Sequence, residues 1–210
     1  MLLFVLWAPM ALVLLKLPDL GTSSEVERFY DSHRDLTRVV SLLVSVGFFL
    51  FLCFLGTLVE RLRQADVSGP LTWIAFGSAL MFMTSLNIAV GLVATADLLS
   101  GRGPPETVHA VHTAAFVIAA PVALAGTAFF AAVAGASFSA AVFPRWLAWG
   151  AVIGAVANVG ALGGLFSLTG PLNAANGIVG GPAVPVLAWV TWILLASLDL
   201  MSGKAKGNRR

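Results

Sequence analysis

The chain has 210 residues, of which 59% are hydrophobic and 10% are charged, and its formal net charge at pH 7 is +2. Soluble domains carry roughly 25% charged residues, so this sequence has too few polar side chains to cover a surface that faces water. The basic residues lie at the ends of apolar runs and form no patch, which excludes nucleic acid as a partner and leaves the lipid bilayer as the expected surroundings.

Long apolar runs between short polar loops predict membrane-spanning helices. A hydrocarbon core of about 30 Å needs about 20 apolar residues per helix, and backbone groups in lipid must be satisfied internally. The runs are continuous and do not alternate, which argues against a β-barrel. We predict a single all-α domain over residues 1–210, a polytopic transmembrane helix bundle of about six spans. The spans are expected at about 2–17, 37–60, 71–99, 108–137, 146–168 and 183–201.

The first run, Leu2 to Leu15, is shorter than the others. It is either a short first helix in a thinned bilayer or a secretory signal sequence that is cleaved. No basic residue precedes it and no clear cleavage site follows it, which favours the helix. The polar stretch 19–38 that comes next is expected to form an amphipathic helical entry into the second span.

The basic residues also suggest an orientation. With both termini on one side, that side carries seven basic residues and the opposite side carries five. The positive-inside rule then places the C-terminus in the cytoplasm.

Small residues are expected to let the helices pack closely in lipid. The fifth span contains two pairs at four-residue spacing, Gly150 with Gly154 and Gly160 with Gly164. These glycines serve either packing within the chain or association with another copy or a partner subunit.

The sequence offers little that an enzyme needs. It has no Walker loop, no His-Glu-x-x-His and no Gly-x-Ser-x-Gly motif, and no charged residue falls in the middle of a span. This pattern points away from an enzyme and predicts no catalytic residue.

One polar group near a membrane surface could bind a metal ion. Asp97 lies near the end of the third span, and His109 and His112 lie at the start of the fourth, three residues apart on one helix face. A carboxylate with two imidazoles could hold a divalent metal, and one imidazole could bind haem. The alternative is that polar residues simply gather at helix ends that face water, with no cofactor.

Four residues inside the spans could line a site for a lipid or a small apolar molecule. Asn87 and Asn158 are polar residues within spans, and Trp189 and Trp192 lie inside the sixth span. The alternative is an interhelical hydrogen bond for each asparagine and packing within the bundle for each tryptophan.

Three segments carry a resemblance to a known group. They are Phe29-Tyr30-Asp31-Ser32-His33-Arg34 before the second span, Phe51-Leu52-Cys53-Phe54-Leu55-Gly56 with Arg61-Leu62-Arg63 at its end, and Phe143-Pro144-Arg145-Trp146-Leu147-Ala148-Trp149-Gly150 before the fifth. With these segments the chain resembles uncharacterised six-helix integral membrane proteins common in actinobacteria. The resemblance implies the topology and a place in a bacterial plasma membrane, and it carries no activity.

The function that we expect first is that of a non-enzymatic accessory or scaffold subunit of a larger membrane complex. A carrier or binder of a lipid or small apolar molecule is the second hypothesis, and a metal- or haem-binding membrane protein is the third.

Overall fold

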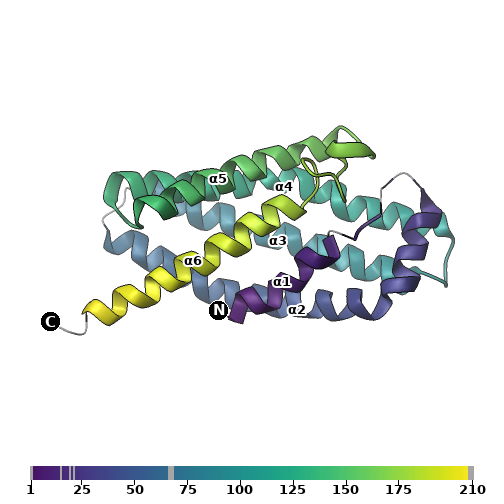
Figure 1. The fold of residues 1–210 in the computed structure, drawn as a ribbon, viewed down its shortest axis with the longest axis horizontal. Coiled ribbons are helices and arrows are strands. Elements are labelled where there is room, and N and C mark those ends of the chain that lie inside the picture. The colour runs from purple at the N-terminus through teal and green to yellow at the C-terminus, as the bar shows by residue number, and fades with distance from the viewer. Residues whose placement is uncertain (1, 15, 19, 21, 66–68, 208–210) are drawn as a thin grey trace.

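The structure, a computed structural model, describes residues 2–14, 16–18, 20, 22–65 and 69–207. Six α-helices and two short 3₁₀ turns follow in the order α1 (Leu2–Leu14), α2 (Ser23–Gln64), α3 (Gly69–Leu99), α4 (Pro105–Ala140), α5 (Arg145–Ala161), η1 (Leu162–Leu165), η2 (Gly170–Leu172) and α6 (Ala183–Gly207). The described part of the chain forms no β-strand. The helices lie roughly side by side, so the predicted all-α bundle is confirmed (Figure 1).

Five of the helices are long and apolar enough to cross a membrane: α2, α3, α4, α5 continued through η1, and α6. Helix α1 has 13 residues, which at 1.5 Å per residue is about 20 Å and shorter than a hydrocarbon core of about 30 Å. Figure 1 shows α1 running along only part of the bundle's length. The first apolar run is therefore a short helix packed on the bundle, and its length is not that of a full crossing.

Helix α2 combines a polar entry with a long apolar segment. It has 42 residues and bends at His33, whose backbone angles (φ −124°, ψ 20°) are not helical. At the bend the Ser32 hydroxyl donates to the carbonyl of Arg28 (2.7 Å), and the His33 ring donates from Nδ1 to the carbonyl of Phe29 (3.2 Å). Side-chain bonds of this kind compete with regular helix geometry. The polar entry before the bend lies across the end of the bundle, as Figure 1 shows in dark purple.

Aromatic rings fill the centre of the bundle. The Trp189 ring on α6 stacks on Phe82 of α3 and Phe129 of α4, with centroid distances of 4.6 and 4.5 Å, and Phe130 lies at 4.7 Å. All four side chains are buried. Such pairs add about 0.5–1.5 kcal/mol each beyond the area that they bury, so this stack ties α3, α4 and α6 together.

Glycines let neighbouring helices approach these rings. A Cβ added at Gly154 would lie 2.9 Å from the ring of Phe130, whereas one at Gly150 would lie 3.5 Å from Trp192. The other predicted pair lies beside the loop before α6, with Gly160 near Val179 and Gly164 near a backbone carbonyl. The four glycines therefore face residues of the same chain.

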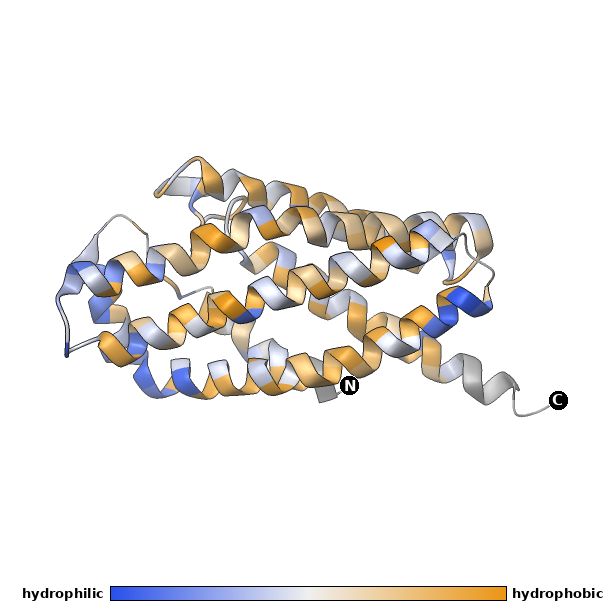
Figure 2. Cartoon of the chain, turned by 180° about the vertical axis from the view of Figure 1, so that it is seen from behind, coloured by the Kyte–Doolittle hydropathy of each residue, from blue (hydrophilic) through white to orange (hydrophobic). Residues whose placement is uncertain are grey.

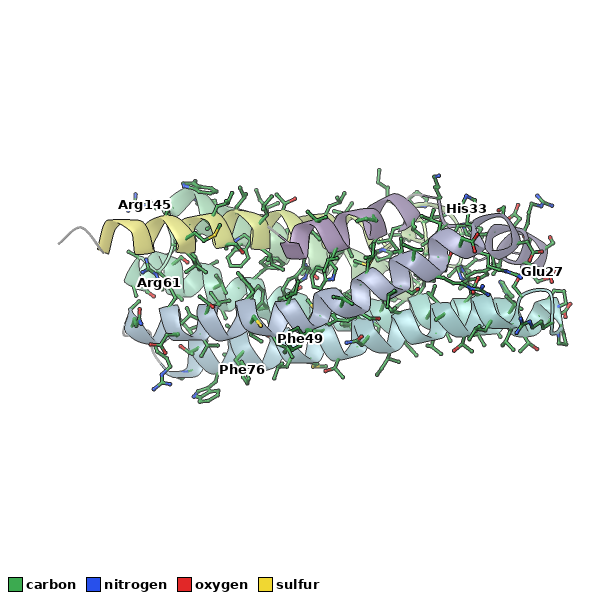
Figure 3. All side chains as sticks on the ribbon, turned by 90° about the horizontal axis from the view of Figure 1, so that it is seen from below. Glu27, His33, Phe49, Arg61, Phe76 and Arg145 are labelled. Carbon is green, nitrogen blue, oxygen red and sulfur yellow. The ribbon has the colours of Figure 1, made fainter. Side chains whose placement is uncertain are left out.

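Polar residues gather at the two ends of the bundle (Figure 2). Figure 3 shows Glu27 and His33 at one end and Arg61 and Arg145 at the other. We call the first the histidine end. There the α2 entry, which contains His33, meets the end of α3 and the start of α4. We call the second the arginine end. Apolar side chains occupy the length between them, as expected for helices that cross a bilayer.

Candidate functional site

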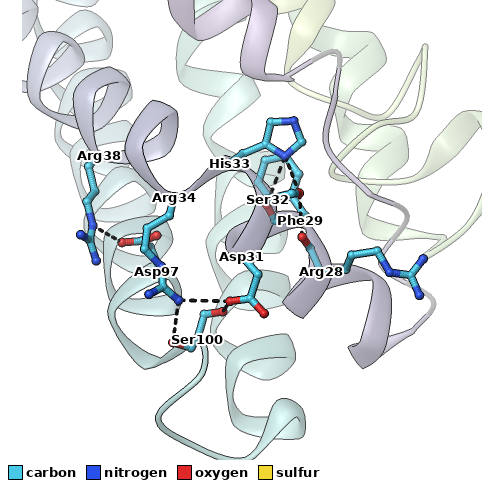
Figure 4. A network of polar contacts seen from close by, with 9 residues as sticks. All are labelled: Arg28, Phe29, Asp31, Ser32, His33, Arg34, Arg38, Asp97 and Ser100. Carbon is cyan, nitrogen blue, oxygen red and sulfur yellow. Dashed lines mark hydrogen bonds and ion pairs between the residues drawn. The ribbon is translucent and has the colours of Figure 1, made fainter.

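The histidine end is held by an ion pair between α2 and α3 in which only the carboxylate is buried. Arg38 donates from Nε to Oδ2 of Asp97 at 2.7 Å (Figure 4). The Asp97 side chain is only 1% exposed, whereas that of Arg38 is 47% exposed. A buried carboxylate requires a partner of opposite charge, so Arg38 is what permits Asp97 to lie at this position.

A second set of contacts, closer to water, joins the α2 entry to the end of α3. The Arg34 guanidinium donates to Oδ1 of Asp31 and to the carbonyl of Ser100, both at 3.1 Å. The Ser100 hydroxyl donates to the same carboxylate oxygen at 3.0 Å. Exposed pairs of this kind contribute at most about 1 kcal/mol, so their main effect is to fix the direction of the entry after its bend (Figure 4).

The two histidines of α4 are held by the segments that precede the second span. The Tyr30 hydroxyl and Nδ1 of His112 are 2.7 Å apart, and both side chains are buried. The His112 ring also lies 4.8 Å from the ring of Phe116, and its Nε2 has no hydrogen-bond partner among the described residues. The His109 ring donates from Nε2 to the carbonyl of Leu20 at 2.7 Å.

The three residues suggested as metal ligands thus have separate partners. Asp97 binds Arg38, His109 binds a backbone carbonyl, and His112 binds Tyr30. The described residues contain no group of three or more His, Cys, Asp or Glu that could hold a metal ion. We therefore treat the contacts of these three residues as joints between helices.

The four residues suggested for an apolar ligand do not line one cavity. Asn87 is exposed on the outside of α3 and makes no hydrogen bond to the described residues. Asn158 is buried, donates to the carbonyl of Gly154 at 2.8 Å and lines a small cavity of ≈ 30 Å³. Trp189 donates to Oδ1 of Asn158 at 3.4 Å and is otherwise enclosed by rings.

The remaining tryptophan, Trp192, is also part of the core. Its indole N–H donates to the carbonyl of Leu147 on α5 at 3.1 Å, and the ring lies edge-on to Phe129 and Phe143. A buried indole needs such a partner for its N–H, so this tryptophan joins α6 to α5 and does not wall a ligand site.

Two residues that hold the histidine end together were given no role from the sequence. Tyr30 is the single tyrosine of the chain, and Arg38 lies where a polar stretch meets a span, at about the depth of Asp97 in the neighbouring span. Opposite charges at equal depth on two antiparallel helices that follow each other in the chain predict an ion pair. The sequence therefore did contain a signal for the pairing of Arg38 with Asp97.

No family model, no curated protein and no solved structure matches this chain.

Proposed function

We propose that this protein is a non-enzymatic scaffold subunit of a larger membrane assembly, and that it assembles with a second copy of itself through the outer face of α3. The observation that carries the proposal is the position of Asn87. This polar side chain lies near the middle of an apolar helix, is exposed, and has no hydrogen-bond partner among the described residues.

A carboxamide that faces hydrocarbon is unfavourable, because lipid tails offer no hydrogen bonds and an unsatisfied amide costs free energy. Polar residues within spans instead face other helices or cavities. Because Asn87 points away from its own bundle, another helix is needed to satisfy it. The asparagine amide both donates and accepts, so the same residue on a second copy is a complementary partner.

The surroundings of Asn87 suit close contact between two copies. Gly77, Thr84 and Gly91 are exposed on the same side of α3 and follow one another at seven-residue spacing. A Cβ added at either glycine would meet nothing within 4 Å. Small residues at this spacing permit close approach of two helices that cross at a shallow angle, as in left-handed membrane bundles.

The orientation and the location of the protein rest on its basic residues and on a resemblance. The excess of basic residues at the arginine end supports a cytoplasmic C-terminus. The resemblance to actinobacterial six-helix proteins supports the bacterial plasma membrane as the location. Neither argument depends on the contact between copies.

Cysteine cross-linking in native membranes tests the contact. The native Cys53 is exposed and must first be replaced by Ala. In that background, Asn87→Cys should give a disulfide-linked dimer on mild oxidation, since the reaction requires Cα atoms within about 7 Å. The matched control is Ile153→Cys on α5, which is exposed and apolar but lies outside the proposed contact, and it should remain monomeric.

A second variant measures the role of the amide. Asn87→Leu should reduce the dimer fraction in vesicles about fivefold, as expected for about 1 kcal/mol of interhelical hydrogen bonding. If Asn87→Cys links no more strongly than Ile153→Cys, the proposal is wrong. A link from Asn87→Cys to a different polypeptide would overturn the second copy as the occupant of this face.

A further inference from the structure

We propose that the connection between α5 and α6, residues 162–181, is embedded in the bilayer leaflet at the histidine end, with its apolar side chains among the lipid acyl chains. We call this segment, which contains η1 and η2, the apolar turn. Its contact with lipid is separate from the outer face of α3 and does not depend on the proposed assembly. The proposal rests on the charge pattern of the sequence, on the depth of the turn, on its exposed side chains and on the way its polar groups are satisfied.

The sequence around the apolar turn carries no charge. From Trp146 to Leu198 it contains no Asp, Glu, Lys, Arg or His. Other connections between long helices do carry charge, with Asp66 after α2 and Arg102 after α3. A charged side chain is costly in hydrocarbon and not in water. The absence of charge throughout this stretch therefore favours a connection that stays in the membrane.

The helices on both sides of the apolar turn are too short to carry it out of the hydrocarbon. Helix α5 starts at the arginine end and has 17 residues, which is about 25 Å against a core of about 30 Å. Helix α6 is free of charge from Ala183 to Leu198, a length of about 24 Å. Helices α3 and α4 have 31 and 36 residues and continue further. Figure 1 accordingly shows the turn stopping short of the end of the bundle where α3 and α4 meet.

Large apolar side chains cover the outside of the apolar turn. Phe166 is 81% exposed and Ile178 is 74% exposed. Four further apolar side chains of the turn are exposed, those of Leu165, Leu168, Leu172 and Val179. They continue the exposed apolar surface of α5, to which Ile153, Val156 and Val159 belong. In water such a surface would be unfavourable, whereas against acyl chains it is the ordinary surface of a span.

Two asparagines satisfy polar groups of the apolar turn from within the protein. Irregular backbone at membrane depth is tolerated only where its polar groups are satisfied without lipid. The buried Asn173 side chain donates to the carbonyl of Leu168, and its Oδ1 accepts from the backbone N–H groups of Ala175 (2.6 Å) and Asn176 (3.2 Å). The Asn176 side chain donates to the carbonyl of Leu17 at 3.3 Å and so ties the turn to the segment after α1.

The backbone of the apolar turn also bonds to itself. The carbonyl of Pro171 accepts from the N–H groups of Val179 (3.0 Å) and Gly180 (3.2 Å). A Cβ added at Gly164 would lie 2.7 Å from the carbonyl oxygen of Gly180, so the two sides of the turn pack backbone against backbone. The turn thus directs these polar groups inward and its large apolar side chains outward, which is the arrangement that a lipid environment requires.

Two exposed polar side chains indicate how deep the apolar turn lies. Thr169 and Asn176 are exposed on it. At the bilayer centre a hydroxyl or an amide would find no partner in the lipid. Near the headgroups, lipid ester carbonyls and water offer partners to both side chains. The turn therefore belongs among the upper parts of the acyl chains, next to the headgroups, and not at the midplane.

Fluorescence quenching of the purified full chain in phosphatidylcholine vesicles tests this position. In a Cys53→Ala background, Phe166→Cys and Ile178→Cys are labelled with the fluorophore NBD. The quencher is either phosphatidylcholine brominated on its acyl chains or iodide on both sides of the vesicle. The lipid control is Ile153→Cys on α5, and the water control is Arg102→Cys, which is exposed in the connection between α3 and α4. Both positions of the turn should lose as much fluorescence to the brominated lipid as Ile153→Cys, and much less to iodide than Arg102→Cys.

If iodide quenches either position of the turn as strongly as Arg102→Cys, the turn lies in water and the proposal is wrong. Quenching by neither agent would mean that a second copy of the chain covers the turn, and would overturn lipid as its partner. Stronger quenching by bromines near the chain ends than by bromines near the headgroup would overturn the depth. Circular dichroism should show each labelled chain as helical as the wild type, and Val179→Cys, which is also exposed, replaces a position whose labelled chain does not fold.

Discussion

The ion pair between Arg38 and Asp97 predicts an asymmetric response to mutation. Arg38→Met leaves the Asp97 carboxylate, 1% exposed, without its partner, and its Oδ1 already has none. Removing one member of a buried pair costs about 3–5 kcal/mol. Because Asp97 lies near the end of α3, we expect about 3 kcal/mol, the lower limit of that range.

The opposite change should cost much less. In Asp97→Asn the Arg38 guanidinium, which is 47% exposed, can turn toward water, so the loss should be about 1 kcal/mol, that of one hydrogen bond. Replacing both charges, in Arg38→Met with Asp97→Leu, should restore the free energy of unfolding to within about 1 kcal/mol of the wild type, because an apolar pair of similar volume avoids the cost of desolvation.

Unfolding in mixed micelles with increasing SDS, followed by tryptophan fluorescence, measures these differences. The control is Arg34→Met, whose partner Asp31 is 54% exposed, and it should change stability by less than about 0.5 kcal/mol. The reasoning is refuted if Asp97→Asn costs as much as Arg38→Met, or if the double variant is no more stable than Arg38→Met alone.

Two further substitutions test the packing of α4 by the same unfolding assay. Tyr30→Phe removes the hydroxyl that pairs with His112 and leaves a buried imidazole unsatisfied, so it should destabilise by about 1–3 kcal/mol. In a chain that already carries His112→Phe, Tyr30→Phe should cost less, because no imidazole is left unsatisfied. An equal cost in both backgrounds would contradict the pairing. Gly154→Ala should cost about 1–3 kcal/mol by overpacking, because its Cβ would meet the Phe130 ring at 2.9 Å. Gly150→Ala, with 3.5 Å to its neighbour, should be nearly neutral, and equal stability of the two alanine variants would argue against close packing at Gly154.

The helices could be predicted from the sequence because length and hydropathy determine which segments cross a bilayer. The third span was expected at 71–99 and α3 covers Gly69–Leu99. The fifth was expected at 146–168, but regular α-helix ends at Ala161 and continues as a 3₁₀ turn. The reason lies in Gly163 and Gly164, which pack against the loop before α6, so that a Cβ at Gly164 would lie 2.7 Å from a carbonyl oxygen.

The direction in which each side chain points could not be predicted. A soluble helix shows its buried face by the position of its apolar residues, whereas these helices are apolar on all sides because both the core and the lipid are apolar. Asn87 was expected to bond a neighbouring helix or to contact a ligand, and it lies on the outside. Trp189 was considered for a ligand wall, and it is stacked in the core. Nothing in the composition of the spans separates these two environments.

The contacts of the histidine end were hidden for a different reason. Arg38 and Asp97 are 59 residues apart in the chain, and Tyr30 and His112 are 82 apart. Several polar groups lie at this membrane surface. The rotation of each helix about its axis determines which of them pair with each other, and the apolar pattern leaves that rotation undetermined. The sequence predicted that His109, His112 and Asp97 lie at one end, and the choice of their partners required the structure.

In a protein surrounded by lipid, the polar groups that the fold leaves without partners carry the most information, because lipid tails cannot satisfy them. Asn87 points outward, whereas Thr37 is 2% exposed and its Oγ1 lacks a partner among the described residues of the bundle, so only Asn87 can be satisfied by a second copy. Their variants should therefore separate: Asn87→Leu should reduce dimerisation, whereas Thr37→Val should leave it unchanged. If Thr37→Val reduced dimerisation as much as Asn87→Leu, the loss could not be assigned to an amide on the outer face of α3, and the proposed contact between copies would be wrong.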